Sequence, residues 1–257
     1  MKKDTTIVGY SKVLARAKKD LNLAEYKIFI LALSKISQLS VNNNLIVSMT
    51  LQEITEATGI STDANHAKER LKAVGRKLVK GSYVEFDKKD GGWGNGNLIA
   101  ATDYSNKVFA LRFDELARPL IEGLQATKNY ITILAEDIYG FDSEYSYLLY
   151  EHLRLYSDTR ITNTRILTDS ELKKIFKLSD DAYVFNGHFD RWIFEKRIMK
   201  KIDNDLKSCR LITFEKQGDF IFEKVKDDKG FIIGYKFIYK INEIHKIEQN
   251  NYLCTTI

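Results

Sequence analysis

The order of polar and apolar residues repeats along this chain after half its length. Thr50-Leu51-Gln52-Glu53 stands directly before apolar residues spaced by three, and Thr168-Asp169-Ser170-Glu171 stands before the same spacing. A Thr-x-x-Glu sequence ahead of a helical apolar period is a capping box, in which both side chains satisfy free backbone N–H groups. The pattern therefore predicts two short capped helices 118 residues apart (50 to 168), within a duplicated unit.

The first half predicts helices followed by β-segments. A further capping-box pattern at Asn22 to Glu25 precedes apolar residues spaced by three and four from Tyr26 to Ile36. Gly59 ends the short capped helix because glycine adopts a positive φ at low cost. We expect residues 1 to about 10 to form a loose arm, 88–97 a flexible hairpin tip and 114–125 a connecting helix. Helices are expected at 22–36, 51–58 and 64–80, and a strand at 45–49. Three further β-segments are expected at 82–86, 98–102 and 107–113.

The second half predicts the same order. Its helices are expected at 145–156, 170–177 and 188–207, and its strands at 164–167, 211–216, 220–225 and 231–241, with a hairpin tip at 227–230. A helix pair followed by a β-hairpin is the order of a winged helix-turn-helix domain. We therefore predict an α+β protein of two tandem winged helix-turn-helix domains related by internal duplication, with boundaries 1–125 and 126–257.

The long helix of the first half has the pattern of a DNA-reading helix. Its apolar residues lie on one side, so its polar side can present amide and guanidinium groups, which pair with adenine and guanine edges. Any surface helix also carries charges opposite its buried side, but the preceding capped helix and the following hairpin favour DNA contact. The candidate DNA-binding residues are Asn65, Lys68, Glu69, Lys72, Arg76, Lys77 and Lys80.

The long helix of the second half is more strongly basic. We expect Ile198, Met199, Ile202 and Leu206 to be buried together with Trp192, whereas Ile193 and Phe194 fall at exposed angles, where they pack on a neighbouring element or touch thymine methyl groups. The candidate DNA-binding residues are His188, Arg191, Lys196, Arg197, Lys200 and Lys201. Arg191 falls near the apolar side, so a role as a structural ion-pair partner stays open for it.

Composition agrees with a binding protein but does not select DNA. A length of 257 residues suits two domains, and 40 Lys and Arg against 35 Asp and Glu give a net charge of +5, which is only mildly basic. Cys209 and Cys254 have no CxxC spacing, which favours a reducing compartment and disfavours zinc. Because no apolar run approaches the ~18 residues of a membrane span, we expect a cytoplasmic protein without membrane contact.

Patterns that would indicate catalysis are weak. The glycine-rich segment 91–96 lacks the Lys-Ser/Thr of a phosphate-binding loop and precedes no helix. The four histidines are dispersed, and His152, on an apolar helix face, is typical of a satisfied core histidine. Without a paired-histidine metal site, none of the tyrosines is favoured as the nucleophile of a rolling-circle nickase. We expect no enzyme activity, catalytic residues, metal or cofactor.

The segment Phe141 to Leu153 resembles the signature of plasmid replication initiators that bind repeated origin sequences, called iterons. Those initiators carry Ser-x-Tyr-Ser-x-Arg-Leu-Tyr-Glu there, and this chain has the same order except that Leu148 replaces the Arg. The similarity covers nearly the whole chain; it continues through 15–27, 167–176, 189–202 and 211–216.

The resemblance implies a function in DNA replication. Each domain's long helix would enter successive major grooves of one iteron in double-stranded origin DNA with direct repeats. Monomers would bind iterons and open the origin, and a homodimer joined through the N-terminal domain would repress its own promoter. The implied partners are a host initiator and the replicative helicase. A winged-helix transcriptional regulator without a replication role remains the alternative, because its DNA chemistry is the same.

Overall fold

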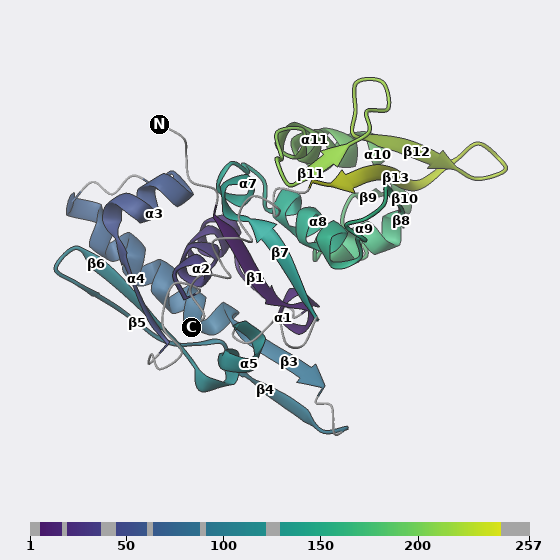
Figure 1. Cartoon of the computed structure of the whole chain (residues 1–257). Coiled ribbons are helices and arrows are strands. Elements are labelled where there is room, and N and C mark those ends of the chain that lie inside the picture. The colour runs from purple at the N-terminus through teal and green to yellow at the C-terminus, as the bar shows by residue number, and fades with distance from the viewer. Residues whose placement is uncertain are drawn as a thin grey trace. The chain divides into compact units, whose positions relative to one another are not determined.

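The chain forms two compact units, Met1–Tyr139 (unit 1) and Gly140–Ile257 (unit 2), each built of helices and strands (Figure 1). The computed structural model describes residues 6–16, 20–36, 45–60, 64–87, 91–121 and 129–242. The expected connecting helix at 114–125 extends in part outside these residues, and its described part forms two short turns, η1 (Glu115–Ala117) and α5 (Arg118–Ile121).

The boundary between the units lies later than the one expected at 125/126. Strand β1 (Ile7–Ser11) pairs antiparallel with β7 (Tyr130–Leu134), so residues 130–139 belong to unit 1. The loose arm expected for residues 1 to 10 is therefore wrong from Ile7 onward, and Tyr10 is fully buried. A strand whose partner lies some 120 residues away leaves little signal in its own sequence.

Unit 1 carries the predicted order of elements. Its long helix α4 (Ala64–Gly81) follows the short helix α3 (Leu51–Thr58) and precedes two hairpins. The remaining elements are α1 (Lys12–Arg16), α2 (Leu23–Ile36), β2 (Ile46–Thr50), β3 (Tyr83–Asp87), β4 (Trp93–Asn97), β5 (Ile99–Ser105), β6 (Val108–Phe113) and α7 (Ala135–Tyr139).

The wing of unit 1 is the β5–β6 hairpin, which forms a three-stranded sheet with β2 in the order β2-β6-β5. Asn106 and Lys107 join its strands with φ values of 50° and 61°, as a tight two-residue turn requires. The flexible tip expected at 88–97 is wrong in its second part, because Trp93–Asn97 pairs with β3. Gly96 suits this strand, since a Cβ there would lie 2.7 Å from Leu116 Cδ2.

Unit 2 repeats this order around the central strand β13 (Ile232–Ile241), which pairs with β8 (Asn163–Thr168), β11 (Ile212–Phe214) and β12 (Phe222–Lys226). Its wing is the β12–β13 hairpin with the expected tip at 227–230. The remaining elements are α8 (Glu144–Leu155), α9 (Asp169–Ile175), β9 (Val184–Phe185), β10 (His188–Phe189), and a long helix made of α10 (Arg191–Phe194), η2 (Glu195–Met199) and α11 (Lys200–Leu206).

Both predicted capping boxes are formed. Thr50 accepts from the Glu53 N–H while the Glu53 carboxylate accepts from the Thr50 N–H, and Thr168 and Glu171 do the same. A left-handed residue follows each short helix at the same offset of 118 residues (59 to 177): Gly59 with φ 71° and Lys177 with φ 55°. The two units thus share local geometry as well as element order, which agrees with the predicted duplication.

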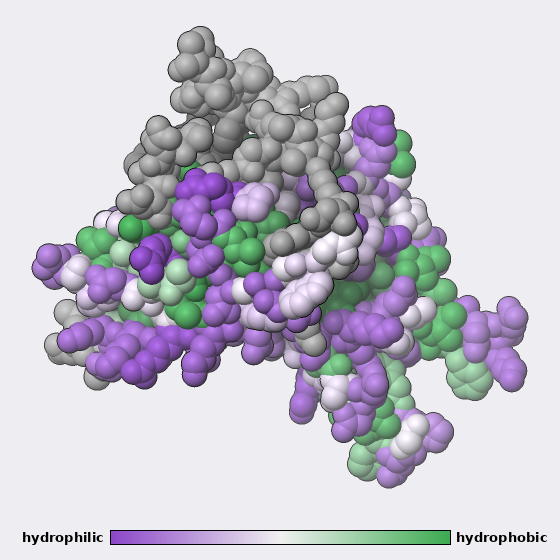
Figure 2. Space-filling view, turned by 90° about the horizontal axis from the view of Figure 1, so that it is seen from below, coloured by the Kyte–Doolittle hydropathy of each residue, from purple (hydrophilic) through white to green (hydrophobic). Residues whose placement is uncertain are grey.

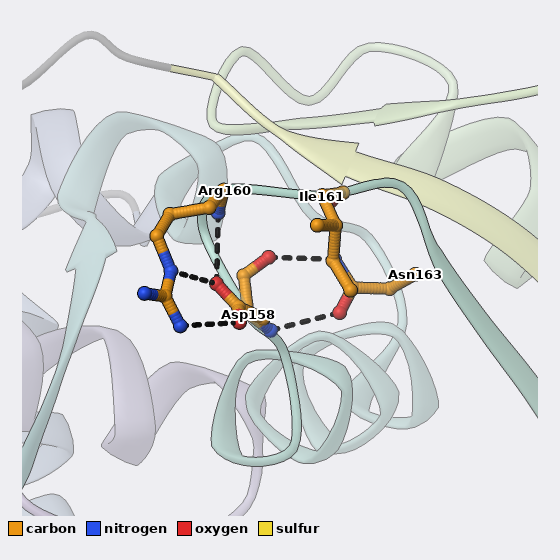
Figure 3. Close-up of polar contacts among 4 residues, drawn as sticks. All are labelled: Asp158, Arg160, Ile161 and Asn163. Atoms are coloured by element: carbon orange, nitrogen blue, oxygen red, sulfur yellow. Dashed lines mark hydrogen bonds and ion pairs between the residues drawn. The ribbon is translucent and has the colours of Figure 1, made fainter.

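A rigid turn leads from α8 into β8 (Figure 3). The Asn163 amide accepts from the Asp158 N–H at 2.8 Å and donates to the carbonyl oxygens of Asp158 and Ile161 at 2.9 and 3.1 Å. The Asp158 carboxylate accepts three bonds from Arg160, and these bonds lower the pKa of Asp158 to about 2. Arg160 is therefore exposed but already neutralised, and the turn fixes the entry to β8 and the capped helix α9.

His152 on α8 gives unit 2 a pH-dependent stability. The sequence analysis expected a core histidine with its hydrogen bonds formed, and this is wrong, because the Nε2 of His152 is buried and has no hydrogen-bond partner among the described residues. Burial, and then the charge of Arg165, lower its pKa from 6.5 to about 4. The folded unit binds fewer protons than the unfolded chain between these values, so its stability is complete above pH 6.5 and falls as the pH approaches 4.

We expect the substitution His152→Phe to remove this pH dependence, because phenylalanine retains a ring against Tyr156, whose centroid lies 4.9 Å away, and cannot titrate. At 1.36 kcal/mol per pKa unit, the histidine would account for at most about 3 kcal/mol between pH 7 and 4. Urea unfolding of both proteins at pH 7 and pH 4.5 measures this difference. If the free energy of unfolding fell by the same amount between pH 7 and pH 4.5 in both proteins, His152 would not be the source of the pH dependence.

Candidate nucleic-acid interface

The outer side of α4 presents several exposed cations. Ala67, Leu71, Gly75 and Leu78 are buried. A Cβ on Gly75 would lie 2.4 Å from Thr102 Oγ1, so this glycine lets the helix pack closely on β5. The exposed predicted residues are Lys68, Glu69, Lys72, Arg76, Lys77 and Lys80.

Ion pairs separate these residues into two groups. Lys77 lies 3.4 Å from the buried carboxylate of Glu25, which ties it to α2. Within the part of the chain that the structure describes, no ion pair involves Lys68, Lys72, Arg76 or Lys80. The side chain of Asn65 lies outside the described residues. Helix α4 therefore offers four free cations on one exposed side, in the arrangement that binds an anionic surface.

The long helix of unit 2 contains a π turn that the sequence analysis did not predict. The Lys200 N–H donates to the Glu195 carbonyl, five residues back rather than four. The buried residues Phe194, Ile198, Ile202 and Leu206 follow one another at four-residue steps, and each such step drifts 40° around a regular α-helix. The wider π turn absorbs this drift and keeps all four on one side.

This turn corrects two expectations about the helix. Trp192 is 68% exposed rather than buried, and Phe194 is fully buried rather than at an exposed angle. The Lys196 Nζ lies 4.7 Å from the Trp192 ring centroid, a distance typical of a cation–π contact. The indole therefore holds this ammonium group on the outer side of the helix.

Four predicted cations lie on this outer side. Lys196, Arg197, Lys200 and Lys201 are all exposed. No ion pair involves any of them among the residues that the structure describes. By contrast, nearby Lys207 pairs with Asp203 and Lys224 with Glu195. Among the described residues, four cations of unit 2 without an ion pair thus lie on the exposed side of its long helix.

Arg191 has the structural role that the sequence left open. Its guanidinium pairs with Asp169 and also donates to Tyr235 Oη at 3.1 Å and to the Ile232 carbonyl at 2.7 Å. These bonds join the first turn of the long helix to α9 and to β13. Because its donors are occupied within unit 2, we do not include Arg191 in the candidate interface.

His188 lies in a small hairpin that precedes the long helix. Strands β9 and β10 pair through His188 with Phe185 and through Phe189 with Val184. Asn186 and Gly187 form the turn with φ values of 50° and 77°. The signal was present in the sequence, because Asn-Gly directly after the apolar pair Val184-Phe185 favours a two-residue hairpin turn. The helix expected from about His188 therefore starts at Arg191, and His188 is exposed on the hairpin.

Comparison with known proteins identifies the family. Residues 7–154 match the family described as Initiator Replication protein, WH1, which is more than half of the 257 residues. The chain belongs to this family of initiator replication proteins. No match was found among curated proteins.

Solved structures similar to this initiator include the crystal structure of Pi initiator protein in complex with iteron DNA. The two chains are 21% identical with a TM-score of 0.70, and the alignment covers 93% of this initiator and 98% of the other chain. Domains 2 and 3 of RctB align with 11% identity and a TM-score of 0.48, over 85% and 80% of the two chains. The family and the similarity to Pi confirm the predicted α+β fold of tandem winged-helix domains.

The described residues of this initiator set two further limits. None of their helices combines the length and apolar character that crossing a membrane requires. They also hold no cluster of three or more His, Cys, Asp or Glu side chains with the geometry of a metal site.

Proposed function

We propose that this initiator binds double-stranded origin DNA sequence-specifically at direct repeats, opens the origin and starts plasmid replication. The observation that carries the proposal is the set of unpaired cations on the long helix of each winged-helix unit, in a chain of an initiator family. A long helix of this kind enters the major groove, where its exposed side chains can contact base edges. The fold-related Pi initiator is described in complex with iteron DNA, which supports the repeat as the ligand.

The proposal assigns the two kinds of side chain different work. The lysines neutralise phosphates and supply affinity, whereas Arg76 and Arg197 can pair bidentately with guanine. We propose that monomers bind the repeats, that a homodimer joined through unit 1 represses transcription, and that a host initiator and the replicative helicase are recruited. The protein acts as a cytoplasmic DNA-binding protein without catalytic residues.

Mobility-shift titrations test the proposal with DNA that carries the direct repeats from beside the coding region. We expect binding to these repeats to exceed binding to a scrambled sequence of equal length by at least about a thousandfold, the lower end for specific DNA-binding proteins. Equal affinity for the two DNAs would overturn the proposal. Specific binding without autonomous replication of a plasmid that carries these repeats would instead indicate a transcriptional regulator.

A further inference from the structure

The hairpin β9–β10 is an addition to the duplicated unit. In unit 1 residues 59–63 connect the short helix to the long helix, whereas in unit 2 residues 176–190 do so, and this connection is three times as long. Five residues are too few to hold a hairpin such as β9–β10 together with its flanking turns. Because unit 1 forms the shared order of elements with the short connection, that order does not depend on the longer one.

The base of this hairpin is anchored firmly. The rings of Tyr183 and Phe189 lie 5.5 and 5.2 Å from the ring of Phe194, measured between centroids. The Asp190 N–H donates to the Tyr183 carbonyl at 2.6 Å, and the Asp190 carboxylate caps the long helix by accepting from the Ile193 N–H. The hairpin is therefore held directly at the start of the long helix.

Next to its tip, in contrast, the hairpin exposes the apolar side chains of Val184 and Phe185 to water. Hydrophobic residues reach the surface at several places among hydrophilic ones (Figure 2), and four aromatic side chains are far more exposed than the other described ones. These are Trp93 at 70%, Phe185 at 71%, Trp192 at 68% and Phe231 at 67%. Phe185 stands next to the tight Asn-Gly turn, so a well-defined backbone presents a phenyl ring that the described residues leave 71% exposed.

We propose that the β9–β10 hairpin enters the major groove beside the long helix and that Phe185 contacts thymine C5-methyl groups. The inference rests on the proposed function. The major groove accepts a two-stranded ribbon as well as a helix, and the thymine methyl is the apolar group displayed there. A phenyl ring cannot form the hydrogen bonds that read other base edges. The base of the hairpin packs on Phe194 at the start of the long helix, and the exposed cations Lys196 and Arg197 follow on the same helix, which favours DNA over an apolar protein partner.

Uracil substitution tests this contact, because replacing thymine with deoxyuridine removes the methyl group alone. Each thymine of one origin repeat is replaced in turn, and the affinities of the wild type, Phe185→Ala and Phe185→Leu are measured. We expect the wild type to lose about fourfold at one or two thymines, the loss that corresponds to ~0.8 kcal/mol per buried methylene-sized group. Phe185→Ala should bind natural DNA more weakly than the wild type and should lose no further affinity when uracil replaces thymine at those positions. Phe185→Leu should still lose affinity on this replacement.

Phe231→Ala is the matched control, since it removes an equally exposed phenylalanine from the other hairpin of unit 2. This variant should keep the wild-type sensitivity at the same thymines. The inference is overturned if the wild type is indifferent to every uracil, if Phe185→Ala remains as sensitive as the wild type, or if it binds natural DNA equally well. Failure of the wild type to prefer the repeats over scrambled DNA would instead overturn the proposed function.

Discussion

Replacing Phe194 with alanine is expected to cost unit 2 about 3–5 kcal/mol of its free energy of unfolding, the range for truncation of a buried phenylalanine. The side chain is fully buried. Its ring centroid lies 6.5 Å from Phe176, 5.5 Å from Tyr183, 5.2 Å from Phe189 and 6.3 Å from Tyr235. Because these rings come from α9, the small hairpin and β13, alanine would leave a cavity where three elements meet. The total free energy of unfolding of small domains is roughly 5–15 kcal/mol, so this loss would bring unit 2 close to unfolding.

Chemical denaturation of the full chain measures this effect. All the ring contacts of Phe194 that the structure describes lie within unit 2, so we expect the transition of unit 1 to remain unchanged. Trp192→Ala is the control on the same helix, because that side chain is 68% exposed and its loss should cost about 1 kcal/mol or less. Similar losses for the two variants would contradict the packing described for this helix.

Elements with local signals could be predicted from sequence. The short helix of unit 1 was expected at 51–58 and lies there, because its limits are set by Thr50 and Glu53 at one end and by Gly59 at the other. Each of these residues acts on backbone groups within a few positions of itself. The same local rules placed the capped helix and the wing of unit 2 to within a few residues. The wing of unit 1 was expected from strands 82–86 and 98–102 and is formed instead by β5 and β6.

Features that depend on distant partners or on a change of helical period could not be predicted in this way. Strand β1 owes its conformation to its pairing with β7, which lies near the other end of the sequence of unit 1. The π turn in the long helix of unit 2 moves the buried side by one residue, so a projection at 100° per residue placed Trp192 and Phe194 on the wrong sides. The role of Arg191 depends on Asp169, which is near it only in the folded unit.

Replacing Arg197, Lys200 and Lys201 together with alanine is expected to weaken binding to the origin repeats on the order of a hundredfold near physiological salt. Each phosphate contact contributes about 0.9 to the slope of log affinity against log salt concentration, so the loss of the two lysine contacts reduces the slope by ~1.8. All three side chains are exposed, and none forms an ion pair among the described residues, so the fold should be unaffected. If Arg197 contacts a base, the preference for the correct base at that one position of the repeat also falls, by about 1–3 kcal/mol of binding free energy.

The control removes the same number of charges from residues whose cations already have partners. Arg118 pairs with Glu115, Arg160 with Asp158 and Lys236 with Glu223, so these three contribute little free positive charge to the surface. Exposed ion pairs stabilise a fold by roughly 0–1 kcal/mol, and the triple alanine variant should therefore fold. Titrations at several salt concentrations should leave its slope close to that of the wild type. If both variants reduced the slope equally, binding would depend on net charge alone. The proposed contact between the long helix of unit 2 and DNA would then be contradicted.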